Sequence, residues 1–142
     1  MNKYTCILTN KIPTIFQESF IKLIREYRNN INLTIDELYG ENDDDKVLYF
    51  LVLDDKKVIS TSRLILSHGI YGYINMVVVD KEYRGQGLCK DNIKKLIKLT
   101  NLKIYLLEVE EKNLHAVKCY ESNGFKIVFT SRNLHLMVCY VK

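Results

Sequence analysis

Hydrophobic and polar residues follow two different patterns along this chain. Where hydrophobic residues recur at every second position, or run together between turn residues, the pattern predicts β-strands. We expect seven strands on this basis, at residues 3–9, 47–53, 58–66, 71–79, 102–109, 125–130 and 134–141. The run Met76-Val77-Val78-Val79 at the end of the fourth strand indicates burial on both faces. Asp54-Asp55-Lys56-Lys57 predicts a hairpin turn between the second and third strands.

Hydrophobic residues three or four positions apart predict helices between these strands. A first helix opens at Pro13 and Thr14, and its apolar face is expected to consist of Phe16, Phe20, Leu23, Ile24 and Tyr27. A capping box at Thr34-Ile35-Asp36-Glu37 predicts a second, short helix. A third helix should run from residue 88 to about 100, with an inner face of Cys89, Ile93, Leu96 and Ile97. A fourth is expected at 113–123, where Gly124 provides a stop.

The order of these elements, β-α-α-β-β-β-α-β-α-β-β, predicts a mixed α/β fold. A length of 142 residues fits one domain over residues 1–142, and 47% hydrophobic with 27% charged residues is an ordinary globular composition. No run approaches ~18 apolar residues, and the amino terminus lacks the features of a secretory signal. We therefore expect a cytoplasmic protein with no membrane partner, either a monomer or a homodimer.

The charge balance and the cysteines limit the function further. The net charge of +4 is mild, and no basic helix is interleaved with aromatic residues, so a nucleic-acid partner is not expected. A bound anionic cofactor would account for the excess equally well. The cysteines form no Cys-x-x-Cys pair, and the three histidines are scattered, so we expect reduced thiols and no metal site. The four cysteines are Cys6, Cys89, Cys119 and Cys139.

The stretch Tyr83-Arg84-Gly85-Gln86-Gly87-Leu88-Cys89-Lys90 is the most informative in the chain. It follows a predicted strand and opens a predicted helix. Two glycines spaced by one residue allow a tight turn whose N–H groups, together with the helix N-terminus, form an anion cradle. The spacing matches neither a Walker loop nor a dinucleotide-binding fingerprint. An ordinary tight turn remains the alternative for these residues alone.

A second motif, Asn113-x-x-Ala116-x-x-x-Tyr120-Glu121-x-x-Gly124-Phe125, follows Leu107-Glu108-Val109. Together with Arg84-x-x-Gly87-x-Cys89, it resembles the GNAT N-acetyltransferase superfamily, and the resemblance is good from residue 58 to 125. Cys89 stands where the family usually has glycine or alanine. Cysteine is small and apolar, and its main-chain N–H is unchanged. The resemblance implies an enzyme that transfers an acetyl group from acetyl-coenzyme A (acetyl-CoA) to an amine, without a metal.

The resemblance also implies where acetyl-CoA binds. The main-chain N–H groups of the cradle would hold the pyrophosphate, and those residues are Arg84, Gly85, Gln86, Gly87, Leu88, Cys89 and Lys90. The main chain of Val77, Val78 and Val79 would pair with the pantetheine arm as an added strand does, and one N–H there would polarise the thioester carbonyl. Asn113 would bind the arm from the far side, while also serving as a helix N-cap.

Two side chains are the expected catalysts. Tyr120 would protonate the departing thiolate, since a phenol with an ordinary pKa of about 10 stays protonated at neutral pH; packing in the core is its other interpretation. Glu108 would be the general base. Strand alternation places it with Leu102, Ile104 and Leu106 on an apolar face, where it should be partly desolvated. The alternative is a glutamate that points to solvent at a strand end, with Glu110 or Glu111 acting through water instead.

The identity of the acceptor amine stays open, because the chain resembles two enzyme families that use different acceptors. Leu107-Glu108-Val109 with the later motif resembles the ribosomal-protein alanine N-acetyltransferases, which implies a peptide or protein amine. The strands at 61–66 and 77–79 are similar to those of glucosamine-6-phosphate N-acetyltransferases, but Asn75 and Met76 replace an acidic pair there. A non-catalytic module that senses acetyl-CoA or coenzyme A (CoA) is the alternative from another functional class.

Overall fold

The computed structural model describes residues 3–27, 46–67 and 70–142. Its strands are β1 (Thr5–Thr9), β2 (Lys46–Asp54), β3 (Lys57–Ser67), β4 (Tyr71–Val79), β5 (Ile104–Glu110), β6 (Lys126–Ser131) and β7 (Leu134–Tyr140). Its helices are α1 (Thr14–Tyr27), α3 (Leu88–Thr100) and α4 (Leu114–Glu121), with a short 3-10 helix, η1 (Lys81–Tyr83). These elements confirm the predicted mixed α/β fold. The short helix predicted at 34–37 lies outside the described residues.

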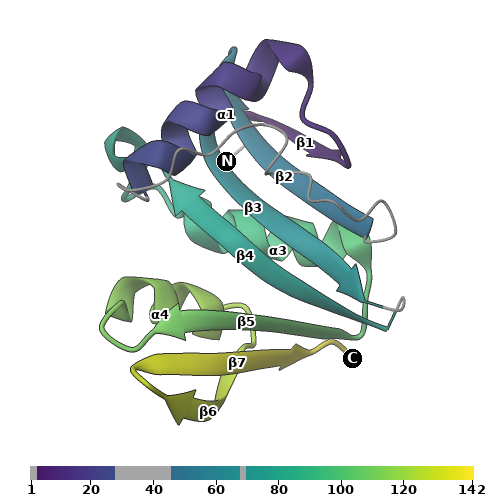
Figure 1. Ribbon diagram of the computed structural model, residues 1–142, viewed down its shortest axis with the longest axis vertical. Helices are drawn as coiled ribbons and strands as arrows, with labels where there is room; N and C mark the ends of the chain where they lie inside the picture. Colours follow the sequence, from purple (N-terminus) through teal and green to yellow (C-terminus); the bar gives the residue numbers. More distant parts are fainter. Residues whose placement is uncertain (1–2, 28–45, 68–69) are drawn as a thin grey trace.

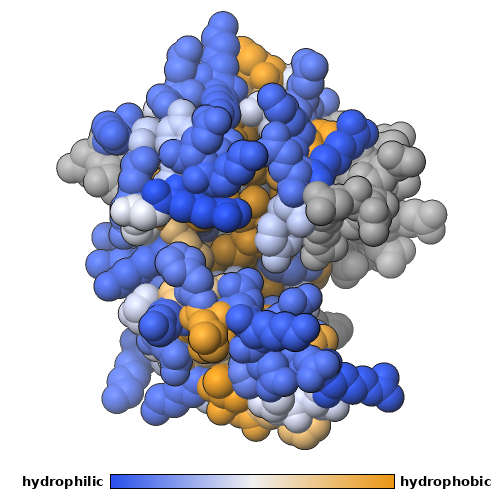
Figure 2. Space-filling view, turned by 90° about the vertical axis from the view of Figure 1, so that its left-hand side faces the viewer, coloured by the Kyte–Doolittle hydropathy of each residue, from blue (hydrophilic) through white to orange (hydrophobic). Residues whose placement is uncertain are grey.

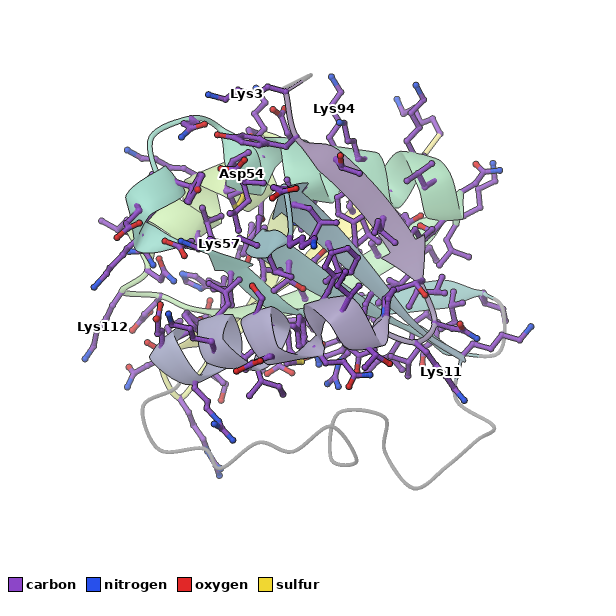
Figure 3. The ribbon with its side chains drawn as sticks, turned by 90° about the horizontal axis from the view of Figure 1, so that it is seen from above. Lys3, Lys11, Asp54, Lys57, Lys94 and Lys112 are labelled. Atoms are coloured by element: carbon purple, nitrogen blue, oxygen red, sulfur yellow. A yellow bond between two sulfur atoms is a disulfide. The ribbon has the colours of Figure 1, made fainter. Side chains whose placement is uncertain are left out.

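The seven strands form one sheet in the order β1-β2-β3-β4-β5-β7-β6 (Figure 1). Every neighbouring pair is antiparallel except β4 and β5, which are parallel and are connected through α3. Figure 3 shows α1 and α3 on opposite sides of the sheet. No helix of the described residues is long and apolar enough to cross a membrane.

Two hydrophobic clusters hold the helices against the sheet. Under α1, Phe20 and Ile24 pack with Tyr49, Met76 and Val78. On the other face, α3 and α4 contribute residues that pack with the interior of β2 to β5 and β7; they include Ile93, Leu96, Val117 and Tyr120. The inner face predicted for α3 is confirmed, because Ile93 and Leu96 are buried and Cys89 and Ile97 pack against the same cluster while half-buried. Leu88 and Asn92 are buried as well. Asn92 is tolerated there because its amide bonds to the hydroxyls of Ser60 and Ser62, at 3.0 and 2.6 Å.

The parallel strands β4 and β5 separate part-way along their length. Their pairing begins at Tyr71 with Ile104 and ends at Ile74 with Leu107. Beyond that point β4 stays paired with β3, and β5 stays paired with β7. We call this opening the β4–β5 fork; its arms are residues 75–79 and 108–110, and they diverge toward the arrowheads in Figure 1.

A β-bulge in β4 sets which residues face which helices. Met76 has a positive φ of 51°, and the β3–β4 register shifts between Thr61 and Arg63. The shift puts Met76 and Val78 under α1, although Ile74 lies on the α3 face. The predicted burial on both faces is confirmed in part. Met76 and Val78 are buried under α1, whereas Val77 and Val79 pack against the other cluster and are half-buried.

The expectation of reduced thiols was wrong for two of the four cysteines. Cys89 in α3 and Cys119 in α4 form a disulfide, with their Cα atoms 6.2 Å apart. That separation lies in the usual range for disulfides. The two residues are 30 positions apart in the sequence, and only the side-by-side packing of α3 and α4 brings them together. Cys6 and Cys139 are free thiols.

Candidate active site

The loop between η1 and α3 presents main-chain N–H groups at a helix N-terminus. Gly85 and Gly87 have φ values of +85° and +78°, which glycine adopts without steric cost. Gly87 is the N-cap of α3, and the N–H of Asp91 donates to its carbonyl oxygen at 3.0 Å. The N–H groups that precede Asp91 in α3 have no helical acceptor, so they are available to an anion. The expected cradle residues, Arg84 to Lys90, therefore form an exposed turn and the first turn of a helix.

Side chains from distant elements fix this loop in place. The Tyr83 hydroxyl donates to Asp54 Oδ2 at 2.7 Å, and this hydrogen bond raises the pKa of Tyr83 to about 12. The Tyr4 hydroxyl donates to Gln86 Oε1 at 2.9 Å. Arg84 Nε donates to the carbonyl oxygen of Val79 at 3.2 Å, which ties the loop back to the end of β4.

Lys57 supports the start of the same loop. Its ammonium group lies 3.5 Å from Asp80 Oδ2 and 5.2 Å from the centre of the Tyr83 ring. Asp54 and Lys57, both labelled in Figure 3, flank the β2–β3 turn. The hairpin turn predicted from the sequence thus lies against the predicted anion cradle.

In the β4 arm of the fork, the main-chain N–H and C=O groups on the side of β5 are not paired with that strand. Residues 75–79 pair with β3 on one side only. Val77 and Val79 lie on the α3 face, and Val78 lies under α1. Figure 2 looks toward the open side of the fork and shows hydrophobic surface between a hydrophilic upper part and a hydrophilic lower part. An extended amide-containing chain could add to such an edge.

Glu108 lies one residue beyond the last β4–β5 pair, on the β5 arm. It is exposed, and the buried face of β5 consists of Tyr105, Leu107 and Val109. The expected desolvation was therefore wrong, because α3 and α4 cover the opposite face of the strand. Both faces of this strand are apolar in its first half, so alternation alone did not reveal which one is covered.

Tyr120 lies on the other face of the sheet from Glu108. Its ring is 6% exposed and packs 6.1 Å from that of Phe125, in the cluster that contains Leu107 and Val109. Burial raises the pKa of Tyr120, and the nearby Tyr27 raises it further. Among the described residues, none accepts a hydrogen bond from the Tyr120 hydroxyl. Core packing and an available hydroxyl coexist in this residue.

The remaining candidates lie at the end of β5 and in the turn that leads to α4. Asn113 is exposed and caps α4, because its Oδ1 accepts from the N–H of Ala116 at 3.2 Å; its predicted N-cap role is confirmed. Glu110 and Glu111 are both exposed. Glu111 donates its main-chain N–H to the carbonyl oxygen of Asn133 at 2.9 Å, which joins this turn to the β6–β7 hairpin.

Comparison with protein families decides the assignment. Residues 11–125 match the model of the Acetyltransferase (GNAT) family. The chain belongs to the GNAT acetyltransferase family. GNAT acetyltransferases use acetyl-CoA as the acetyl donor, and this chain is accordingly an acyltransferase with that donor. The cradle, the fork and the two motifs recognised in the sequence all lie within or at the edge of the matched region.

Solved structures share the GNAT fold along almost the whole chain. The ribosomal-protein-S18-alanine N-acetyltransferase of Escherichia coli is 16% identical, with a TM-score of 0.77 and coverage of 97% of this chain and 95% of that one. Spermidine N-acetyltransferase of Vibrio cholerae, in complex with CoA and spermine, is 20% identical, with a TM-score of 0.75 and coverage of 99% and 96%. A GNAT-family acetyltransferase of Staphylococcus aureus is 17% identical, with a TM-score of 0.74 and coverage of 97% and 100%.

Several residues that shape this GNAT site were not found from the sequence. Tyr73 donates its hydroxyl to Glu108 Oε1 at 3.1 Å, and Tyr4 and Asp54 support the cradle loop. These bonds join positions 29 to 82 residues apart, and no local pattern signals them. Among residues 3–27, 46–67 and 70–142, no group of three or more metal-binding side chains was found.

Proposed function

We propose that this protein acetylates a primary amine, with Glu108 as the general base and Tyr120 as the general acid. The observation that carries the proposal is their placement on opposite faces of the β5 arm, at the fork. An acyl transfer needs one proton removed from the attacking amine and one given to the leaving sulfur. Two groups on opposite faces can do both without competing for the same position.

The donor is expected to lie along the fork. The N–H groups of residues 84–90 suit its pyrophosphate, because they point outward from a helix N-terminus. The free edge of Val77, Val78 and Val79 suits the amides of the pantetheine arm, and Asn113 would bind the arm from the α4 side. A main-chain N–H of Val77 or Val78 would polarise the thioester carbonyl.

The residues then act in sequence. Glu108 accepts a proton from the ammonium form of the acceptor, directly or through one water, and leaves a lone pair on nitrogen. As the new C–N bond forms and the C–S bond breaks, Tyr120 donates its phenolic proton to sulfur. The raised pKa of Tyr120 keeps that proton in place at neutral pH. The acetylated nitrogen releases its second proton, and the tyrosinate recovers one from solvent.

For the acceptor, we propose a protein or peptide amine, or an amino sugar such as glucosamine 6-phosphate, without choosing between them. The carboxylates of Glu108 and Glu110 lie on the same exposed face of β5, which favours an acceptor that arrives as a cation. The similar structures include enzymes named for ribosomal protein S18 alanine and for spermidine, which are both amines. A polyamine therefore belongs in the panel to be tested.

Glu108→Gln tests the base. The variant keeps the shape and removes the proton acceptor, so we expect turnover to fall most at neutral pH. The loss should shrink as pH rises, because alkaline solution supplies uncharged amine without help. Turnover is measured as thiol release from acetyl-CoA across a pH series.

Glu110→Gln is the matched control, since Glu110 is an exposed carboxylate on the same strand face. An equal loss at every pH in Glu108→Gln would show that Glu108 positions the substrate instead. A loss confined to the Glu110→Gln or Glu111→Gln variant would move the base to that residue.

A further inference from the structure

A side-chain hydrogen bond joins β4 to β5 at the base of the fork. The Tyr73 hydroxyl donates to Glu108 Oε1 at 3.1 Å. Tyr73 pairs with Leu106 in the β4–β5 ladder, and Glu108 follows the last ladder pair by one residue. The bond therefore crosses from β4 to β5 at the point where the main-chain ladder stops.

Strand alternation puts both side chains on the face of the sheet that carries α1. Ile74 and Leu107, their neighbours in sequence, lie in the cluster under α3 and α4. Tyr73 is half-buried, whereas Glu108 is exposed. The tyrosine ring is thus the more restrained partner, and its hydroxyl reaches out to a carboxylate that solvent surrounds.

An exposed glutamate at the end of a strand would otherwise sample several rotamers. A general base must come within about 2.6–3.2 Å of the proton that it removes, so this freedom lowers the fraction of productive geometries. The hydroxyl that donates to Oε1 restricts the Glu108 side chain. It leaves the lone pairs of Oε2 free to take a proton from the acceptor amine. A hydrogen bond to an ionised carboxylate is also stronger than one between neutral groups.

We infer that Tyr73 is a positioning residue for Glu108. It acts through the carboxylate and does not itself touch the reacting atoms. The inference rests on the proposed function, because it requires Glu108 to be the base.

The test is a double-mutant cycle of Tyr73→Phe and Glu108→Gln, read as kcat and as KM for acetyl-CoA. Tyr73→Phe removes only the hydroxyl, and kcat should fall roughly 10- to 150-fold, as expected for a hydrogen bond to a charged group. The KM for acetyl-CoA should not change, because the cradle and the Val77–Val79 edge are untouched. In the Glu108→Gln background, Tyr73→Phe should cause little further loss.

Tyr71→Phe is the control, since it removes a hydroxyl from the same face of the same strand and should keep wild-type kcat. Wild-type kcat in Tyr73→Phe would overturn the inference. If Tyr73→Phe lowered kcat by the same factor in the wild-type and Glu108→Gln backgrounds, the inference would also be overturned, because Tyr73 would then act independently of Glu108. If the single variant Glu108→Gln keeps wild-type turnover, Glu108 is not the base. That result would contradict the proposed function itself, and the inference about Tyr73 along with it.

Discussion

At the scale of single residues, two buried tyrosines show how the same side chain serves different purposes. Tyr105 is fully buried, and its hydroxyl bonds to the N–H of Leu102, to Thr100 and to the carbonyl of Ile97. Those bonds fasten the end of α3 to β5. Tyr120 is almost as buried, yet no described residue accepts a hydrogen bond from its hydroxyl. That difference is consistent with a structural role for Tyr105 and with the general-acid role proposed for Tyr120.

Tyr120→Phe should therefore lower kcat without unfolding the protein. The ring keeps its contacts with Phe125, and the loss of a general acid is expected to reduce kcat roughly 10- to 1000-fold. Affinity for CoA should change little. Steady-state kinetics and calorimetric binding measure the two effects.

Tyr105→Phe is the matched comparison. It leaves the N–H of Leu102 without its partner and should destabilise the fold by about 1–3 kcal/mol, while kcat of the folded enzyme stays near wild type. Wild-type kcat in Tyr120→Phe would leave Tyr120 as a packing residue only.

At the scale of elements, the N-terminus of α3 carries the proposed cofactor cradle, and the same helix packs against the core of the sheet. Gly87 has a positive φ, and in the described part of the chain no atom apart from its sequence neighbours lies within 4 Å of where a Cβ would be. Gly87→Ala would therefore strain the backbone rather than clash with neighbours, and it would disturb the N–H groups that follow. We expect the rise in melting temperature on adding CoA to be largely lost in this variant.

Gly124→Ala provides a control for the strain itself. Gly124 also has a positive φ, of 91°, and an added Cβ would make only ordinary contact with Cys139 Sγ at 3.6 Å. Both variants should lose stability of the order of 1–2 kcal/mol. A normal CoA shift in Gly87→Ala would contradict the role of the cradle, whereas Gly124→Ala should keep that shift.

Because a disulfide joins α3 to α4, we expect a reductant to lower the thermal stability of the protein. Closing a loop of 30 residues is expected to contribute about 3–4 kcal/mol, so dithiothreitol should lower the melting temperature by roughly 10 °C. Cys119→Ser should melt like the reduced protein and lose this sensitivity, and Cys6→Ser should retain it. Four titratable thiols in the unreduced protein, with no effect of reductant, would rule out the bridge.

The bounds of the strands and helices also show how much of the fold could be predicted from the sequence. The alternation and turn residues predicted β4 with the bounds that the structure has, and the other described strands to within two residues at most ends. They could not predict the bulge at Met76, because it arises from pairing with β3 and reverses which residues face α1. The covered face of β5 and the Cys89–Cys119 bridge depend likewise on where α3 and α4 pack.

For the candidate site, the motifs predicted which residues take part, but they could not predict the environment of those residues. Gly85, Gly87 and Asn113 have the local conformations expected of a tight turn and an N-cap, because such features depend on neighbouring residues alone. The exposure of Glu108 and its bond to Tyr73 depend on a parallel pairing across 35 positions, which no local pattern encodes.

At the scale of the whole molecule, the parallel pair β4 and β5 provides the proposed binding site in the sheet. The strands on either side continue the sheet in both directions, and at the fork the main chain of β4 loses β5 as a partner. The cradle lies beyond the end of one arm, and the proposed base and acid flank the other. A non-catalytic CoA sensor would need the cradle and the edge, but it would not need Glu108 and Tyr120.

Amine-dependent thiol release from acetyl-CoA is the measurement that separates these cases. The wild-type protein is incubated with acetyl-CoA and with amino sugars, polyamines, amino acids or short peptides, and free thiol is followed over time with a no-amine control. We expect at least one primary amine to accelerate thiol release, with a matching acetylated product seen by mass spectrometry. Tight binding of CoA without release above the control for any member of the panel would contradict the catalytic account and favour the sensor.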